Sequence, residues 1–128
     1  MLLLSRILTG IVALAHVWFL ILEMFLWQHP IGLKTFGFTP ELAAQTAVLA
    51  ANQGLYNGFL AAGLVFGMLH TNRKTGITLQ LFFLACIIVA GIYGAVTAKL
   101  SILFVQALPA VLALAAVWVS AKGVIESD

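Results

Sequence analysis

The sequence LAANQGLYNGFL, from Leu49 to Leu60, places four polar side chains inside a chain that is otherwise mostly apolar. At about 100° per residue of an α-helix, these side chains lie on one side of the helix. Removing an amide or hydroxyl group from water without a hydrogen bond costs about 1–3 kcal/mol in proteins. Neighbouring helices, water or a ligand must therefore supply partners to this polar stretch, which consists of Asn52, Gln53, Tyr56 and Asn57.

The rest of the chain has the composition of an integral membrane protein. Of its 128 residues, 63% are hydrophobic and 8% are charged, and the mean hydropathy is +1.15. A soluble domain of this length would carry roughly a quarter charged residues. The net charge is only +2 and the basic residues are scattered, which argues against a nucleic-acid partner and favours the lipid bilayer.

Four apolar segments of about 20 residues fill most of the length. They predict one all-α domain over residues 1–128, a four-helix transmembrane bundle, with spans at 7–27, 50–68, 76–97 and 101–120. Residues 28–39 are expected to form a loop at the membrane interface, and residues 40–49 to form an interfacial lead-in to the second span. A tight connection around Lys99 makes the last two spans antiparallel neighbours.

Local signals mark one helix start and one kink. Thr39-Pro40-Glu41 combines a capping hydroxyl, a proline suited to the first helical position and an acid near the positive helix end. Pro109 lies inside the fourth span, where it cannot donate a backbone hydrogen bond, so a kink is expected there.

The distribution of basic residues predicts the orientation. Four of them fall on one side of a four-span topology and two on the other, and cytoplasmic loops are enriched in Lys and Arg. Both termini are therefore expected in the cytoplasm, on the side that holds Arg6, Arg73, Lys74 and Lys122 and not on the side of Lys34 and Lys99.

Polar residues from all four predicted spans fall at a similar depth, in the outer half of the bundle. Glu23 lies about one turn inside the first span, level with the polar stretch, Tyr93 and Gln106. His16 lies seven residues before Glu23, two turns deeper on the same line of the helix. Gln80 is expected to lie apart from them, near the cytoplasmic end.

Glu23 is the main functional candidate because a carboxylate at mid-membrane costs about 2.5–3.5 kcal/mol on insertion scales. Glu23 with His16 or Tyr56 has the groups needed for acid–base chemistry on a lipophilic molecule. We therefore take Glu23 and His16 as candidate catalytic residues, and Asn52, Gln53, Tyr56, Asn57, Tyr93 and Gln106 as candidate ligand-binding residues. One His and one Glu fall short of the three or four ligands of a transition-metal site, so no metal is predicted, and no motif indicates a cofactor.

Four segments together resemble the DUF1304 family of small bacterial membrane proteins of unknown function. They are the polar stretch with its flanks, LEMFLW at Leu22–Trp27, VAGIYGA at Val89–Ala95 and FVQALPA at Phe104–Ala110. The resemblance covers essentially the whole chain. It implies a four-span protein of the bacterial inner membrane, and it brings no activity with it.

Two classes of function stay open. In the first, an outward-facing polar pocket binds a small lipophilic or amphipathic molecule, and the protein is an enzyme or a carrier. In the second, the protein is a non-catalytic accessory subunit whose polar residues only lock its helices together. Either class is compatible with a homo-oligomer.

Overall fold

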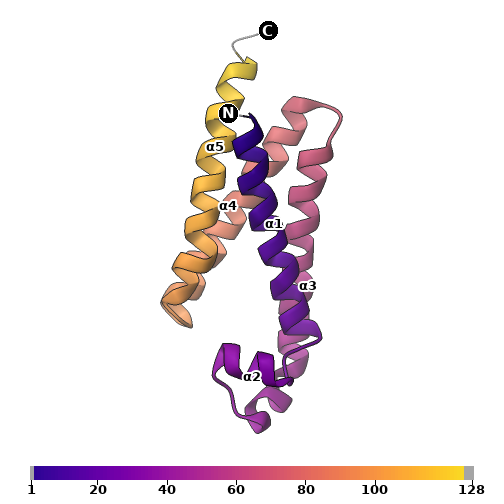
Figure 1. The fold of residues 1–128 in the computed structure, drawn as a ribbon, viewed down its shortest axis with the longest axis vertical. Helices are drawn as coiled ribbons and strands as arrows, with labels where there is room; N and C mark the ends of the chain where they lie inside the picture. The colour runs from indigo at the N-terminus through magenta and orange to yellow at the C-terminus, as the bar shows by residue number, and fades with distance from the viewer. Residues whose placement is uncertain (1, 126–128) are drawn as a thin grey trace. The chain divides into compact units, whose positions relative to one another are not determined.

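The computed structural model describes residues 2–125, and the side chains of residues 2–122. These residues form five α-helices, a π-helical segment and no strands, and 88% helix confirms the all-α prediction (Figure 1). Within the described chain, three helical stretches are long and apolar enough to cross a membrane. They are α1 (Leu2–Met24), α4 (Arg73–Thr97) and Leu103–Lys122, which joins η1 (Leu103–Ala107) to most of α5 (Leu108–Ile125).

The remaining long helix is α3 (Pro40–Leu69), with 30 residues. It contains the polar stretch, whose amide and hydroxyl groups lower its hydropathy. The predicted lead-in at 40–49 and the predicted span at 50–68 both belong to this one helix.

The helices fall into two compact units, one of Met1–Ala13 and Ala62–Asp128, the other of Leu14–Ala61. Because α1 and α3 each cross a boundary, both helices contribute to both units. That the units together form one transmembrane domain remains a prediction.

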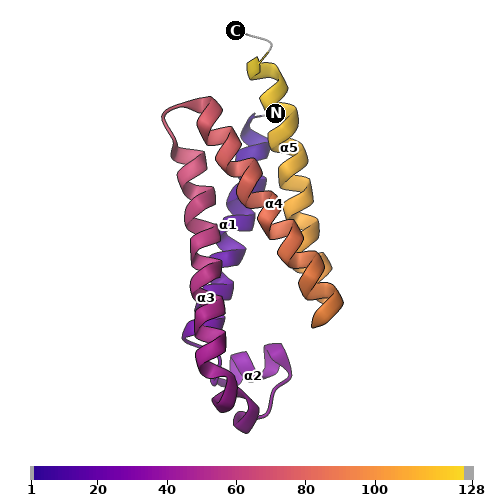
Figure 2. The same cartoon turned by 180° about the vertical axis from the view of Figure 1, so that it is seen from behind.

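In the first unit, α4 and α5 lie side by side in both views (Figures 1 and 2). The expected tight connection is confirmed, because α4 ends at Thr97 and helical structure resumes at Ser101. A Cβ added to Gly91 would lie 2.9 Å from the backbone nitrogen of Ala107, so the helices would have to shift to accommodate it. Glycine at this position therefore lets the two helices approach closely.

A kink was expected at Pro109, and the structure has a π-helical segment, η1, that ends two residues before the proline. The amide of Leu108 donates to the carbonyl of Leu103, five residues earlier. Pro109 has no amide hydrogen to continue a regular ladder, and a π-helical turn is one recognised way in which a helix accommodates such a break.

In the second unit, the prediction of a loop over residues 28–39 is wrong for its central part, because α2 (Pro30–Phe36) is helical. Pro30 occupies the start of α2, and Nδ1 of His29 caps it by accepting from the amide of Ile31 at 3.3 Å. Gly37 ends the helix with φ of 71°, a left-handed conformation that favours glycine.

The predicted start of the next helix is confirmed. α3 begins at Pro40, and Oγ1 of Thr39 accepts a hydrogen bond of 3.3 Å from the amide of Leu42. The cap satisfies one amide of the first turn, which has no partner within the helix.

Candidate functional site

Two glycines bring α1 and α3 close together in the second unit. A Cβ added to Gly54 would lie 2.7 Å from Cγ of Met24 and 3.2 Å from the carbonyl oxygen of Leu20. A Cβ added to Gly58 would lie 2.6 Å from a methyl group of Leu20. Small residues four apart are a common means of close helix approach in membranes, and here they determine which side chains of the two helices meet.

The close approach allows Glu23 and Asn57 to form a hydrogen bond. Nδ2 of Asn57 donates to Oε2 of Glu23 at 2.7 Å. Asn57 is 6% exposed and lies on the buried side of α3 with Ala50, Gly54 and Ala61, whereas Glu23 is half-buried. Of the candidate site residues, these two are therefore joined directly by the structure.

The other members of the polar stretch have a different environment. Asn52, Gln53 and Tyr56 are exposed on α3. Nδ2 of Asn52 donates to the carbonyl of Val48 in its own helix at 3.0 Å. The Tyr56 ring lies 6.2 Å from that of Phe59, measured between ring centroids. Within the stretch, only the Asn57 side chain is buried.

His16, the second candidate catalytic residue, is 1% exposed. Its ring packs edge-on against Phe19, with centroids 5.4 Å apart. Glu23 lies seven positions after His16, which corresponds to a rise of roughly 10.5 Å along α1. A ligand that contacts both side chains would therefore have to extend along two turns of the helix.

Tyr93 and Gln106 belong to the other unit. Tyr93 is 70% exposed. Nε2 of Gln106 donates to the carbonyl of Ile87 at 3.5 Å, a long hydrogen bond that connects η1 to α4. Tyr93 and Gln106 are candidate ligand-binding residues only because of their depth in the predicted spans.

The second unit contains an aromatic cluster that the sequence analysis did not predict. The rings of Trp27, Phe36 and Phe38 form a triangle, with centroids 4.5, 5.3 and 6.1 Å apart, and Nε1 of Trp27 donates to Oγ1 of Thr46 at 3.1 Å. Gly32 packs directly on the carbonyl oxygen of Leu26. The sequence signal for α2, the helix that carries Phe36, was His29-Pro30, because a proline can start a helix as well as stop one.

The chain belongs to the family described as "Protein of unknown function (DUF1304)", whose model matches residues 10–118. It is also similar to the "Uncharacterized protein YpaA" of Lactococcus lactis subsp. lactis (strain IL1403), with 31% identity over 116 residues. That alignment covers 89% of this chain and 96% of the relative. No solved structure matches the chain significantly.

Proposed function

We propose that this DUF1304 member is a four-span protein of the bacterial inner membrane that binds a small lipophilic or amphipathic molecule at Glu23 and Asn57, as an enzyme or a carrier. The observation that carries the proposal is the geometry of the Glu23 carboxyl. Asn57 contacts its Oε2 atom at 2.7 Å. The half-buried side chain leaves Oε1 as the atom that a polar group of the ligand would meet.

The energetics favour a functional role for this carboxyl over a purely structural one. A hydrogen bond between membrane helices contributes about 0.6 kcal/mol on average. An ionised carboxylate at mid-membrane costs about 2.5–3.5 kcal/mol, less near the interface, so one bond from Asn57 offsets only part of that cost. Helix packing alone would be served better by two apolar residues of similar size.

The surroundings of Glu23 determine the ligand class that we propose. Leu20 and Met24 flank the carboxyl on α1, and the small faces of Gly54 and Gly58 oppose them. Because these contacts leave no room between the two helices, a ligand would place one polar group at Glu23 and its apolar part outside this close contact. Tyr56, Asn52 and Gln53 are exposed on the adjoining faces of α3, where they supply further donors and acceptors.

In this proposal α3 also crosses the membrane, as the second of four spans in chain order. Its 30 residues give a length of roughly 45 Å, more than a hydrocarbon core of about 30 Å requires. Both termini are proposed to lie in the cytoplasm because the basic residues divide four to two in favour of that side.

A specific observation supports the second candidate function, a non-catalytic subunit. Asn52 bonds to the backbone of its own helix, and Gln106 bonds to the backbone of α4. If Glu23 and Asn57 likewise serve only each other, the polar groups stabilise the helices and bind nothing.

Glu23→Gln separates the two functions, with Glu41→Gln as the matched control. Glu41 is the other acid among the described residues, exposed in the first turn of α3. Each protein is extracted from native membranes and examined by native mass spectrometry for a bound small molecule. We expect one in the wild type and in Glu41→Gln, and its loss in Glu23→Gln with helicity retained.

Infrared spectroscopy of the carboxyl band gives an independent measurement. The Glu23 band, identified by its absence in Glu23→Gln, should shift when the extracted molecule is added back to the wild type. A Glu23→Gln protein that melts at a lower temperature but keeps the molecule would contradict the proposal and favour the structural role.

A further inference from the structure

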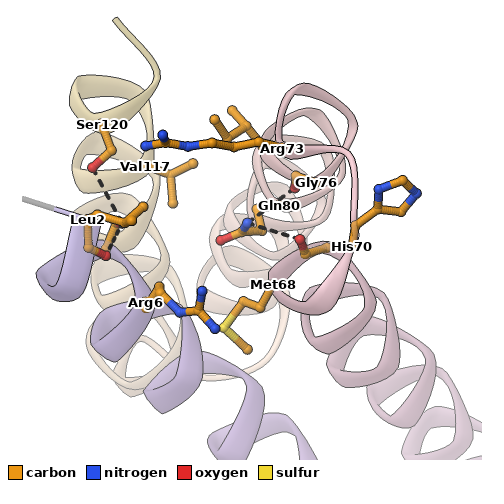
Figure 3. A pocket seen from close by; sticks show the side chains of 12 residues that line it. Leu2, Arg6, Met68, His70, Arg73, Gly76, Gln80, Val117 and Ser120 are labelled. Carbon is orange, nitrogen blue, oxygen red and sulfur yellow. Dashed lines mark hydrogen bonds between the residues drawn. The ribbon is translucent and has the colours of Figure 1, made fainter. Parts of the chain in front are cut away.

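A second polar site lies in the unit of Met1–Ala13 and Ala62–Asp128. It is a cavity of about 200 Å³ bordered by the start of α1, the end of α3, the start of α4 and the later turns of α5 (Figure 3). We call it the basic cavity, after two of its lining residues. None of the candidate residues discussed above lines it. Its lining includes Ser5, Arg6, Arg73, Gln80, Val117 and Ser120.

Arg6 and Arg73 reach the basic cavity from different helices. Arg73 extends from α4 toward Val117 and Ser120 of α5, whereas Arg6 extends from α1 toward Met68 of α3 (Figure 3). Both arginines are exposed. Over residues 2–13 and 62–122 of this unit, whose side chains the structure describes, the sequence contains no acidic residue. An anion bound in the cavity would be attracted by both positive charges.

The end of α3 and the start of α4 pack closely together beside the cavity. Nε2 of Gln80 donates to the carbonyls of Gly67 and Gly76, at 3.3 and 3.2 Å. A Cβ added to Gly76 would lie 2.5 Å from the carbonyl oxygen of Gly67. Gln80, expected from the sequence to lie alone, therefore connects the two helices beside the cavity.

The backbones that carry the two arginines are also anchored. Oγ of Ser120 donates to Oγ of Ser5 at 3.4 Å, which joins α5 to α1 next to Arg6. Oδ1 of Asn72 accepts from the amide of Thr75 at 3.0 Å, which makes Arg73 the first residue of α4. The positions from which both guanidinium groups extend are thus determined by the fold.

The size and chemistry of the basic cavity match a phosphate headgroup. Its volume of about 200 Å³ is below the roughly 300–1,000 Å³ of clefts that enclose drug-sized ligands. A guanidinium group can donate two parallel hydrogen bonds to two phosphate oxygens, a geometry that an ammonium group lacks. Leu2, Met68 and Val117 add apolar surface beside the arginines, where the glycerol and first methylene groups of a lipid would lie.

We propose that the basic cavity binds the phosphate group of an anionic membrane phospholipid, with Arg6 and Arg73 contacting it from two helices. Basic pockets between membrane helices are known to bind anionic headgroups in this way. The proposal depends on α1, α4 and α5 lying in a membrane, and it does not depend on a ligand at Glu23.

The test is titration of the purified protein, in a neutral detergent, with phosphatidylglycerol and with phosphatidylcholine, read by native mass spectrometry. The wild type should bind phosphatidylglycerol preferentially. The Arg6→Gln/Arg73→Gln double variant should bind it about thirtyfold more weakly, from roughly fivefold per basic residue. Arg6→Lys/Arg73→Lys should be intermediate, because the charge stays and the paired donors are lost.

Lys99→Gln is the matched control, since Lys99 is exposed in the same unit at the opposite end of α4. It should bind phosphatidylglycerol like the wild type, as should Glu23→Gln, so failure at one site is distinguishable from failure at the other. If the double variant does not keep its helicity, the single variants replace it, each with an expected fivefold loss.

Three results would overturn the proposal. One is equal binding of phosphatidylglycerol and phosphatidylcholine by the wild type. Another is unchanged phosphatidylglycerol binding by folded arginine variants. The third is displacement of phosphatidylglycerol by inorganic phosphate at equal concentration, because a soluble anion would then be the ligand.

Discussion

Nδ2 of Asn57 donates a hydrogen bond of 2.7 Å to Oε2 of Glu23, a residue 34 positions earlier in the chain. The distance is at the short end for a bond of this type. It connects α1 to α3 at the level where Gly54 leaves room for the two helices to meet. The pair gives the proposed site its geometry and also makes a contribution to stability that can be measured.

The first prediction concerns this contribution. Asn57→Ala should lower the free energy of unfolding by about 1–3 kcal/mol, because the Glu23 carboxyl loses its donor. Asn52→Ala should change it by about 0.5 kcal/mol or less, since Asn52 is exposed and bonds only to its own helix. Thermal melting in detergent measures both. Equal losses in the two variants would mean that the pair has no special role in stability.

The second prediction concerns the packing of α4 against η1. Gly91→Ala should destabilise the protein by about 1–3 kcal/mol, because the added Cβ would lie 2.9 Å from both the backbone nitrogen and Cβ of Ala107. Gly10→Ala is the control, since nothing lies within 4 Å of a Cβ added there. It should leave melting unchanged or raise it slightly, by removing a flexible residue from a helix. A Gly91→Ala protein as stable as Gly10→Ala would contradict this close approach.

The third prediction concerns the aromatic cluster. Thr46→Val should lower the free energy of unfolding by about 0.5–1.5 kcal/mol, because Nε1 of Trp27 loses its acceptor at 3.1 Å. Thr46→Ser keeps the hydroxyl and should behave like the wild type. In a Trp18→Phe/Trp118→Phe background, Trp27 is the only tryptophan, so its fluorescence should change in Thr46→Val alone. Identical emission from both Thr46 variants would argue against this hydrogen bond.

The fourth prediction concerns topology. With four spans and both termini in the cytoplasm, a fluorescent protein that matures only in the cytoplasm should be active at the C-terminus. An alkaline phosphatase fused there should be inactive, and the same phosphatase inserted near Lys34 should be active. The reverse pattern at both positions would mean an inverted protein, and an active phosphatase at both positions would mean an odd number of spans.

Composition and local pattern were enough to predict much of the secondary structure. The lack of charge and the long apolar segments indicated membrane helices, and the structure has three helical stretches that meet that description. The cap at Thr39 and the tight connection at Lys99 were both predicted correctly. Such features can be predicted because they depend on residues that are neighbours in the sequence. The helix α2 was missed because Pro30 is compatible with both ending one helix and starting another.

The sequence by itself thus determined the helical class, the polar stretch and the presence of a carboxyl within an apolar helix. Only the tertiary structure decided that Glu23 meets Asn57 and that Arg6 and Arg73 border one cavity. The physical reason is that helical periodicity gives the side of a helix on which a residue lies, but not the neighbour that it faces. That neighbour depends on the rotation and approach of two helices, which here follow from contacts at glycines such as Gly54 and Gly76.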